Sequence, residues 1–212
     1  MTDSLAGFTY RFEKGSAAGA PPILLLHGTG GDENDLIDLG RVVAPGSPLL
    51  SPRGQVLENG MPRFFRRLAE GVFDEADLKQ RTDALANFVI AARERYGLEA
   101  PIALGFSNGA NIAAAMLMQH PYVLCGAVLL RAMVPYADPP SASIPRTPVL
   151  IASGAQDPIM PASNPAQLAA QLRERGATVD HRVVPASHGL TQTDVSLAAA
   201  FIKNVAAKAP AL

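Results

Sequence analysis

Three polar residues, each in a loop of small side chains, could together perform nucleophilic catalysis. Ser107 lies within GFSNG, Asp157 within SGAQDP and His188 within PASHG. A serine hydroxyl becomes a good nucleophile when a base takes its proton, and an imidazole with a pKa near neutrality suits that task. A carboxylate on the other ring nitrogen fixes the tautomer and stabilises the imidazolium. We therefore predict Ser107 as nucleophile, His188 as base and Asp157 as the acid, although Asp157 could instead cap the next helix.

The sequence around Ser107 predicts a strained turn between a strand and a helix. An apolar segment over 101–106 precedes the serine, and a run of small residues with helical character over 110–119 follows it. Such a turn leaves no room for side chains beside the serine, and Gly105 and Gly109 have no Cβ atom. The positive end of the following helix also favours an anion at the serine. The alternative is an ordinary turn serine.

Other histidines and aspartates compete for the same roles, but their positions fit structural roles better. His120 ends a helix before a proline, His181 lies within a strand pattern, and His27 is expected to shape a turn through hydrogen bonds. Asp180 also lies within a strand pattern, and Asp194 opens a helix. His188 is the histidine that follows a late strand in a small-residue loop.

A second glycine-rich loop could stabilise a negative charge on the substrate. The segment HGTGGD over 27–32 follows the first buried strand. Such a turn can aim backbone N–H groups at a developing oxyanion, and we assign the donors as the N–H groups of Thr29 and Asn108. A phosphate cradle is the rival interpretation. The loop lacks the Lys-Ser/Thr ending of a P-loop and the Gly-x-Gly-x-x-Gly pattern, which disfavours it.

The elements that must position these loops alternate between strands and helices along the chain. Expected strands cover 8–13, 23–26, 48–52, 101–106, 123–130, 147–153 and 178–184, and expected helices cover 34–42, 78–96, 110–119, 165–175 and 194–207. This alternation predicts an α/β fold with a mostly parallel central sheet and helices on both faces. The 8–13 strand, which alternates apolar and polar residues, is expected at an edge. We expect one domain over 1–212, with ligands bound beyond the carboxyl ends of the strands.

Composition excludes several classes of protein. The 212 residues are 48% hydrophobic and 17% charged, with 18 Lys and Arg against 19 Asp and Glu, so no global field attracts nucleic acid or an anionic membrane. The single cysteine, Cys125, excludes an internal disulfide or a thiolate metal cluster and is expected in the core. Neither a signal peptide nor a run long enough to cross a membrane is apparent. A soluble cytoplasmic protein is expected.

The segment over 60–73 is the expected specificity element. Met61, Phe64, Phe65 and Phe73 could line an acyl or aryl pocket, because such pockets are mostly apolar. The alternative is that they are core residues under a surface loop.

The same segment carries a basic cluster with two interpretations. Arg63, Arg66 and Arg67 could attract a carboxylate or phosphate on a substrate. They could instead form a solvated face paired with the nearby acids Glu70, Asp74 and Glu75.

Three of these motifs, HGTGGD, GFSNG and GAQDP, resemble the phospholipase/carboxylesterase branch of the α/β-hydrolases, which includes acyl-protein thioesterases. Arg53-Gly54, the 59–65 segment and the 73–78 segment are most similar to small bacterial carboxylesterases. The resemblance implies an α/β-hydrolase fold and ester hydrolysis without a metal or organic cofactor. It also implies a homodimer as one candidate assembly. Asn108 stands where many acyl-protein thioesterases have Gln, which disfavours a thioesterase.

The favoured hypothesis is a serine carboxylesterase that hydrolyses small esters with short or medium acyl or aryl groups, because so short a chain leaves room for only a minimal lid. Lysophospholipase or acyl-thioester hydrolase activity on the same triad is the alternative. A hypothesis of another class is a non-catalytic ligand-binding protein on a hydrolase scaffold, against which the complete triad argues.

Overall fold

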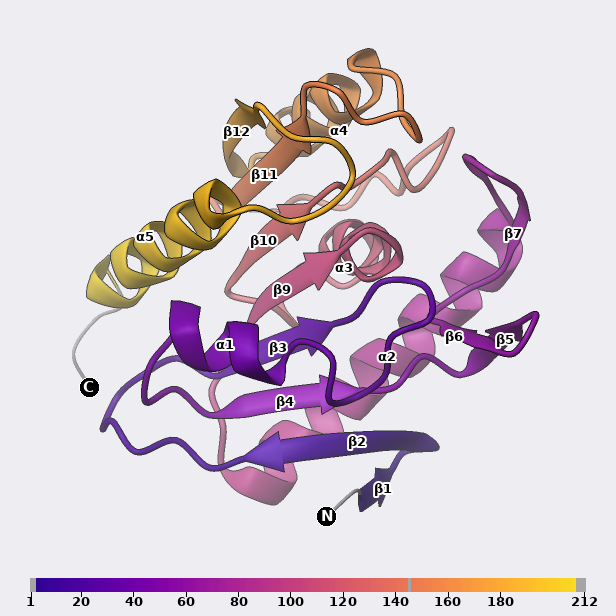
Figure 1. Ribbon diagram of the computed structural model, residues 1–212. Helices are drawn as coiled ribbons and strands as arrows, with labels where there is room; N and C mark the ends of the chain where they lie inside the picture. Colours follow the sequence, from indigo (N-terminus) through magenta and orange to yellow (C-terminus); the bar gives the residue numbers. More distant parts are fainter. Residues whose placement is uncertain (1–2, 145, 209–212) are drawn as a thin grey trace.

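The computed structural model describes residues 3–144 and 146–208 (Figure 1). The strands in this part of the chain are β1 (Asp3–Leu5), β2 (Phe8–Glu13), β3 (Ile23–Leu26), β4 (Leu49–Pro52), β5 (Val56–Glu58), β6 (Met61–Arg63), β7 (Arg67–Ala69), β8 (Val72–Phe73), β9 (Ile102–Phe106), β10 (Gly126–Leu130), β11 (Pro148–Gly154) and β12 (Thr178–Val184). The helices are α1 (Ile37–Val43), α2 (Glu75–Tyr96), α3 (Asn108–Gln119), α4 (Ser163–Glu174) and α5 (Gln192–Lys208).

The central sheet has the strand order β1-β2-β4-β3-β9-β10-β11-β12. From β4 to β12 each neighbouring pair is parallel, whereas β2 runs antiparallel to β1 and β4. The parallel strands therefore end at a common edge, from which the loops after β3, β9, β11 and β12 emerge (Figure 1). The α/β architecture predicted from the sequence, with a mostly parallel sheet and helices on both faces, is confirmed.

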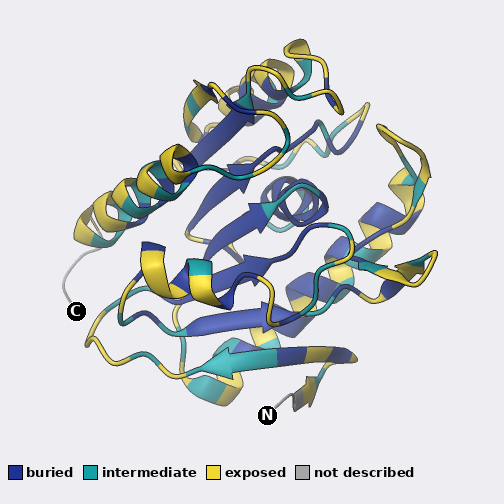
Figure 2. Cartoon of the chain, in the orientation of Figure 1, coloured by how far each residue is buried: buried dark blue, intermediate teal, exposed yellow. Residues whose placement is uncertain are grey.

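Both faces of the sheet are covered, which explains the continuous apolar runs of its central strands. In β3, Ile23 and Leu25 belong to the core cluster that contains residues of α1 and α5, whereas Leu24 and Leu26 belong to the cluster that contains residues of α2, α3 and α4. Successive side chains of a strand point to opposite faces, so a strand between two helical layers must be apolar at every position. Figure 2 shows these central strands as buried, with exposed residues on the outer faces of the helices.

Local signals set the ends of α2. Asp74 at its N-cap accepts a hydrogen bond from the Asp77 N–H, and Gly97 adopts the left-handed conformation that closes its C-terminus. No helix in the described ranges is long and apolar enough to span a membrane.

Several details differ from the expectations. The 8–13 strand is not at the edge, because the short β1 pairs with its outer side. The strand expected over 123–130 begins only at Gly126, and Cys125, expected in the core, is exposed in the turn before it. The irregular 56–73 segment forms two antiparallel hairpins, β5–β6 and β7–β8, which were not predicted.

Candidate active site

Ser107 occupies a strained turn between β9 and α3, as its flanking glycines predicted. Its φ of 52° and ψ of −114° place it in a region that residues with a Cβ rarely adopt. A Cβ on Gly105 would lie 2.6 Å from the Gly109 carbonyl oxygen, so this position accepts no side chain. A serine at the N-cap usually bonds the first turn of its own helix. The Ser107 hydroxyl makes no such cap bond and is free to take part in another interaction.

That interaction is with His188, and it continues to Asp157. The Ser107 Oγ lies 2.9 Å from the His188 Nε2, and the His188 Nδ1 lies 2.8 Å from the Asp157 Oδ2. Because a carboxylate only accepts, Nδ1 carries the proton and Nε2 is left to accept the serine hydroxyl proton. These distances are within the range needed for proton transfer from a nucleophile to its base.

Burial and hydrogen bonds fix the Asp157 carboxylate beside the His188 ring. Its side chain is 1% exposed, and its second oxygen, Oδ1, accepts a hydrogen bond from the Ile159 N–H at 2.9 Å. The next helix begins only at Ser163, so Asp157 does not cap it. A buried carboxylate with one oxygen on a backbone donor and the other on an imidazole can orient the ring and stabilise its charged form.

The glycine-rich turn after β3 packs directly against the serine turn. A Cβ on Gly109 would lie 2.0 Å from the Leu26 carbonyl oxygen, so the backbones of β3 and α3 approach closely here. In residues 3–144 and 146–208, neither the Thr29 N–H nor the Asn108 N–H donates a hydrogen bond to the protein. Unpaired N–H groups beside a nucleophile are the donors that an oxyanion requires.

His27 shapes this turn as a neutral imidazole. Its Nε2 accepts a hydrogen bond from the Gly54 N–H at 2.9 Å, so the proton sits on Nδ1, which donates to the Gly28 carbonyl oxygen at 2.7 Å. Burial lowers the pKa of His27 below its ordinary value, against the raising effect of the Gly28 bond. The side chain thereby ties the turn to the segment that leads into the hairpins.

The competing histidines and acids have partners of their own. His120 lies 2.8 Å from Asp83, and the His181 Nε2 lies 2.9 Å from the Ser153 Oγ. Asp180 forms an ion pair with Arg182 on the surface. These contacts agree with the structural roles expected for them.

The four expected pocket residues fall into two groups. Phe64 and Phe65 are buried in the main core, where Phe64 packs against the His27 ring and Phe65 meets Phe73 edge to face. Phe73 is half-buried, whereas Met61 is 41% exposed and lies over Gly30. The phenyl groups at 64 and 65 are therefore core side chains, and Met61 is the most exposed of the four.

The basic cluster also divides. Arg63 is almost completely buried, and its guanidinium donates to the Thr29 Oγ1 at 2.7 Å and to the Phe65 carbonyl oxygen at 3.2 Å. Burial lowers its pKa, against the raising effect of Glu58 at 3.3 Å. The solvated face expected from the sequence is thus wrong for Arg63.

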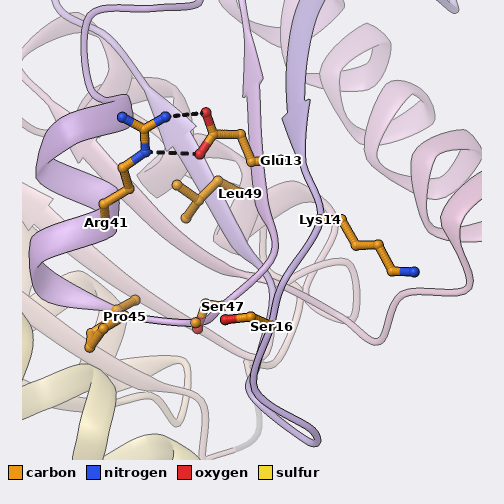
Figure 3. A pocket seen from close by; sticks show the side chains of 9 residues that line it. Glu13, Lys14, Ser16, Arg41, Pro45, Ser47 and Leu49 are labelled. Carbon is orange, nitrogen blue, oxygen red and sulfur yellow. Dashed lines mark hydrogen bonds and ion pairs between the residues drawn. The ribbon is translucent and has the colours of Figure 1, made fainter.

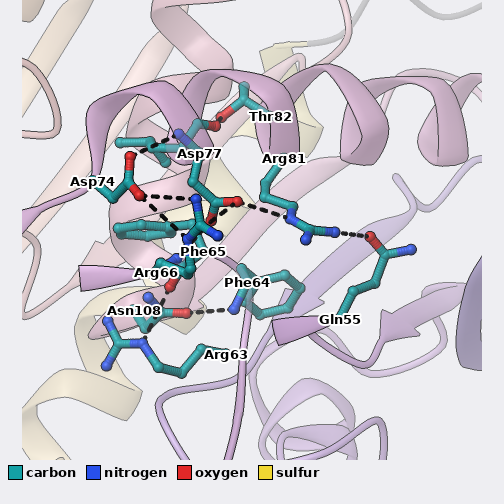
Figure 4. A network of polar contacts seen from close by, with 11 residues as sticks. Gln55, Arg63, Phe64, Phe65, Arg66, Asp74, Asp77, Arg81, Thr82 and Asn108 are labelled. Carbon is teal, nitrogen blue, oxygen red and sulfur yellow. Dashed lines mark hydrogen bonds and ion pairs between the residues drawn. The ribbon is translucent and has the colours of Figure 1, made fainter. Parts of the chain in front are cut away.

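The two other arginines are paired at the surface, but not with all of the expected acids. Arg66 pairs with Asp74 and approaches Asp77, and Arg67 pairs with Glu58. Figure 4 shows the contacts of Arg66 together with the bond from the Phe64 N–H to the Asn108 Oδ1, which attaches the 63–66 segment to the serine turn.

Two hollows in the described surface lie away from Ser107. One, seen in Figure 3, is lined by the end of β2, the end of α1 and the start of β4, at the edge of the sheet opposite the triad. The other lies between Glu75, Gln119 and Tyr136, and Gln119 ends the helix that Ser107 begins. Neither hollow contains a candidate catalytic group.

Sequence reasoning missed Arg131, which lies next to the triad. It follows the apolar strand β10 and is completely buried, with its guanidinium against the loop that carries His188. Arg131 could have been recognised in the sequence as a charged residue that directly follows an apolar strand.

Comparison with known proteins gives a consistent result. Residues 11–206 match the family model described as Phospholipase/Carboxylesterase. The chain is 44% identical over 195 residues to the provisionally assigned hydrolase MhqD of Bacillus subtilis (strain 168), covering 91% of this chain and 96% of that protein. Its fold is similar to that of the Bacillus cereus carboxylesterase, with a TM-score of 0.91, 42% identity and coverage of 93% and 94%. A Mesorhizobium loti carboxylesterase has a TM-score of 0.86 and 31% identity, with coverage of 94% and 95%.

Proposed function

Because this chain belongs to the phospholipase/carboxylesterase family of hydrolases, we propose that it is a serine carboxylesterase that cleaves small esters through an acyl-enzyme on Ser107. The observation that carries this proposal is the continuous series of contacts from the Ser107 Oγ through the His188 imidazole to Asp157, at 2.9 Å and 2.8 Å. Membership of the family supports a hydrolase over a non-catalytic binding protein.

In the first half of the reaction, Ser107 is acylated by the ester. Its Oγ attacks the ester carbonyl carbon while the His188 Nε2 takes the hydroxyl proton. The carbonyl oxygen becomes an oxyanion that accepts from the N–H groups of Thr29 and Asn108. As the C–O bond to the alcohol breaks, Nε2 returns the proton to the departing oxygen, and Asp157 remains ionised throughout.

In the second half, water replaces the alcohol. His188 takes a proton from water as its oxygen attacks the acyl carbon, and returns that proton to Ser107 when the carboxylic acid leaves. No redox step or further reactant is needed.

The exposed side chains of the hairpins favour the alternative substrate class, lysolipids or acyl thioesters. Leu57, Met61, Leu68 and Val72 all expose large apolar surfaces. An apolar surface near a nucleophile could carry a long acyl chain. Relative rates on short aryl esters and on a long-chain lysolipid separate the two, and we expect the short esters to be preferred.

The test is turnover of aryl esters of graded acyl length by matched variants. Ser107→Ala should reduce kcat by at least ~10³-fold with little change in stability, because the whole nucleophilic route is lost. Ser153→Ala is the control, since it also removes a hydroxyl next to a histidine nitrogen, at 2.9 Å. Its kcat should stay near the wild-type value. Undiminished hydrolysis by Ser107→Ala would remove Ser107 from the mechanism.

A further inference from the structure

Arg131 is a completely buried charge at the edge of the sheet where the triad lies. It directly follows β10, has a φ of +59° and exposes none of its side chain. Charged side chains are rarely buried in this way unless every polar group is paired. The backbone strain and the buried charge both indicate a position that the surrounding structure strictly determines.

All five N–H groups of the guanidinium have an acceptor. The Nε donates to the Ser187 carbonyl oxygen at 3.0 Å, and the Nη2 donates to the Gly189 carbonyl oxygen at 2.9 Å. The Nη1 donates to the Ala152 carbonyl oxygen at 3.2 Å. The remaining two N–H groups bind the Asp194 carboxylate in the bidentate manner, at 2.8 Å and 2.9 Å.

These acceptors connect Arg131 to the loop of each triad member. Ser187 and Gly189 are the neighbours of His188 on either side, so their carbonyls determine where that backbone segment lies. Ala152 belongs to β11, the strand that leads to the Asp157 loop. The residue before Arg131, Leu130, accepts a hydrogen bond from the Ser107 N–H at 2.9 Å.

Asp194 balances the charge and connects the pair to the next helix. Its Oδ2 also accepts from the N–H and the hydroxyl of Thr191, each at 2.8 Å, which caps the first turn of α5. Burial alone would raise the pKa of Asp194, but the hydrogen bonds from Arg131 and Thr191 outweigh it and lower that pKa. The carboxylate therefore stays ionised opposite the guanidinium.

We propose that Arg131 is a positioning residue for His188: its guanidinium holds the carbonyls on both sides of the histidine, and Asp194 is its counter-ion. This inference rests on the proposed function, because it assigns Arg131 a part in the same triad. A planar fork with five donors suits this task, whereas the three donors of lysine cannot make all of these contacts.

Two variants separate positioning from mere stabilisation. Arg131→Met alone would leave Asp194 charged, buried and unpaired, which is strongly destabilising. The double variant Arg131→Met with Asp194→Asn removes both charges and keeps an oxygen to cap Thr191. Arg131→Lys keeps the charge pair but loses the fork.

Arg175 provides a matched control. Its guanidinium also donates to backbone carbonyls, those of Pro139, Pro140 and Gln171, but none of these residues is a neighbour of Ser107, Asp157 or His188 in the sequence. Arg175→Met should lower Tm without changing kcat.

Each variant is compared with wild type below its own unfolding transition, by kcat, KM and the rate of Ser107 labelling by a fluorophosphonate. We expect Arg131→Lys and the double variant to lose roughly 10- to 100-fold in kcat and in labelling rate, because small misplacements of a catalytic group are costly. KM should stay within about twofold, since Arg131 does not face the substrate. In nuclear magnetic resonance spectra, the downfield proton of the His188–Asp157 hydrogen bond should weaken.

Either folded variant with kcat and labelling rate within about twofold of wild type would overturn the inference. The proposed function fails separately, if Ser107→Ala remains active. A Ser107→Ala variant without activity beside a fully active Arg131 variant would reject the positioning role alone.

Discussion

At the scale of single residues, close approaches between backbones determine how the site is assembled. A Cβ on Gly109 would lie 2.0 Å from the Leu26 carbonyl oxygen and 2.6 Å from that of His27. A Cβ on Gly154 would lie 2.4 Å from the Ser187 carbonyl oxygen. Glycine at these positions allows the glycine-rich turn after β3 to contact the serine turn, and the Asp157 loop to contact the His188 loop.

Gly109→Ala should therefore damage both folding and catalysis. The added methyl must push β3 away from α3, which we expect to cost about 1–3 kcal/mol in the free energy of unfolding and to separate the two oxyanion donors, with a loss of ~10²-fold in kcat. Urea denaturation and ester kinetics measure the two effects. Gly189→Ala, also beside the triad but with open space around its Cβ, is the control and should behave as wild type. Wild-type kcat in Gly109→Ala would contradict this account of the turn.

The neutral state of His27 predicts how stability depends on pH. Burial holds the pKa of His27 below the ordinary histidine value of about 6.5, so below about pH 6.5 the unfolded chain binds a proton that the folded chain does not. The stabilising contribution of the neutral ring is complete above that pH and is lost as the pH falls toward the lowered folded pKa.

The measurement is the free energy of unfolding by urea between about pH 5 and pH 7.5, where one proton of difference contributes a slope of ~1.4 kcal/mol per pH unit. His27→Asn should have a lower free energy of unfolding at every pH. That free energy should also depend less steeply on pH than in wild type, by up to ~1.4 kcal/mol per pH unit. Identical slopes in the variant and in wild type would show that His27 is not held neutral.

The sequence singled out Ser107, Asp157 and His188, which the structure brings into contact, because each combines a chemical type with a place after a strand. It did not predict Arg131, because an arginine after an apolar run also fits an ordinary surface loop. Nor did it predict that Arg63 is buried, because the acceptors that compensate its charge, Thr29 and Phe65, are brought to it only by the fold.

At the scale of elements, the two hairpins are attached to the active site at several points. Pro62 accepts from the Gly30 N–H at 3.0 Å, and the Phe64 N–H donates to Asn108 at 2.7 Å. The Arg66 N–H donates to the buried Asp77 of α2 at 2.7 Å (Figure 4). The segment is therefore held between the serine turn and α2, with Met61 against Gly30 of the glycine-rich turn after β3.

Met61→Ala should change how the enzyme selects acyl groups. Loss of this apolar contact should raise KM for medium-chain esters by about three- to tenfold, with little effect on acetate esters or Tm. The control is Val42→Ala on α1, which removes an apolar side chain that is 64% exposed and belongs to neither hairpin, and its KM values should not change. Equal KM values for Met61→Ala and wild type across the series would exclude Met61 from the substrate site.

Periodicity predicted the long elements well and the short ones poorly. The 178–184 strand agrees at both ends, and the apolar run at 23–26 is β3. The hairpin strands span only two or three residues and contain Pro, Arg and Met, so no alternation marks them. Their pairing depends on the hydrogen bonds that hold the segment, which a local pattern does not contain.

At the scale of the whole molecule, charge is balanced and its effects are local. The net charge is −1, and the buried pair Arg131–Asp194 satisfies its own charges within the core. A neutral ester should therefore reach the site without electrostatic steering.

The kcat/KM for a neutral aryl ester should change by less than about twofold between ~20 mM and ~500 mM NaCl, because screening has little to act on. Initial-rate measurements of kcat/KM across this range of NaCl concentration test the expectation. A fall of fivefold or more, if Tm is unchanged over the same range, would instead reveal a charged group in substrate capture.

The central claim is that Ser107, His188 and Asp157 act as one unit, and fluorophosphonate labelling followed by intact-protein mass spectrometry tests it most directly. We predict one adduct per folded chain, located on Ser107, that forms at least ~10³-fold more slowly in His188→Gln. An adduct on another residue, or equally fast labelling without His188, would contradict the account.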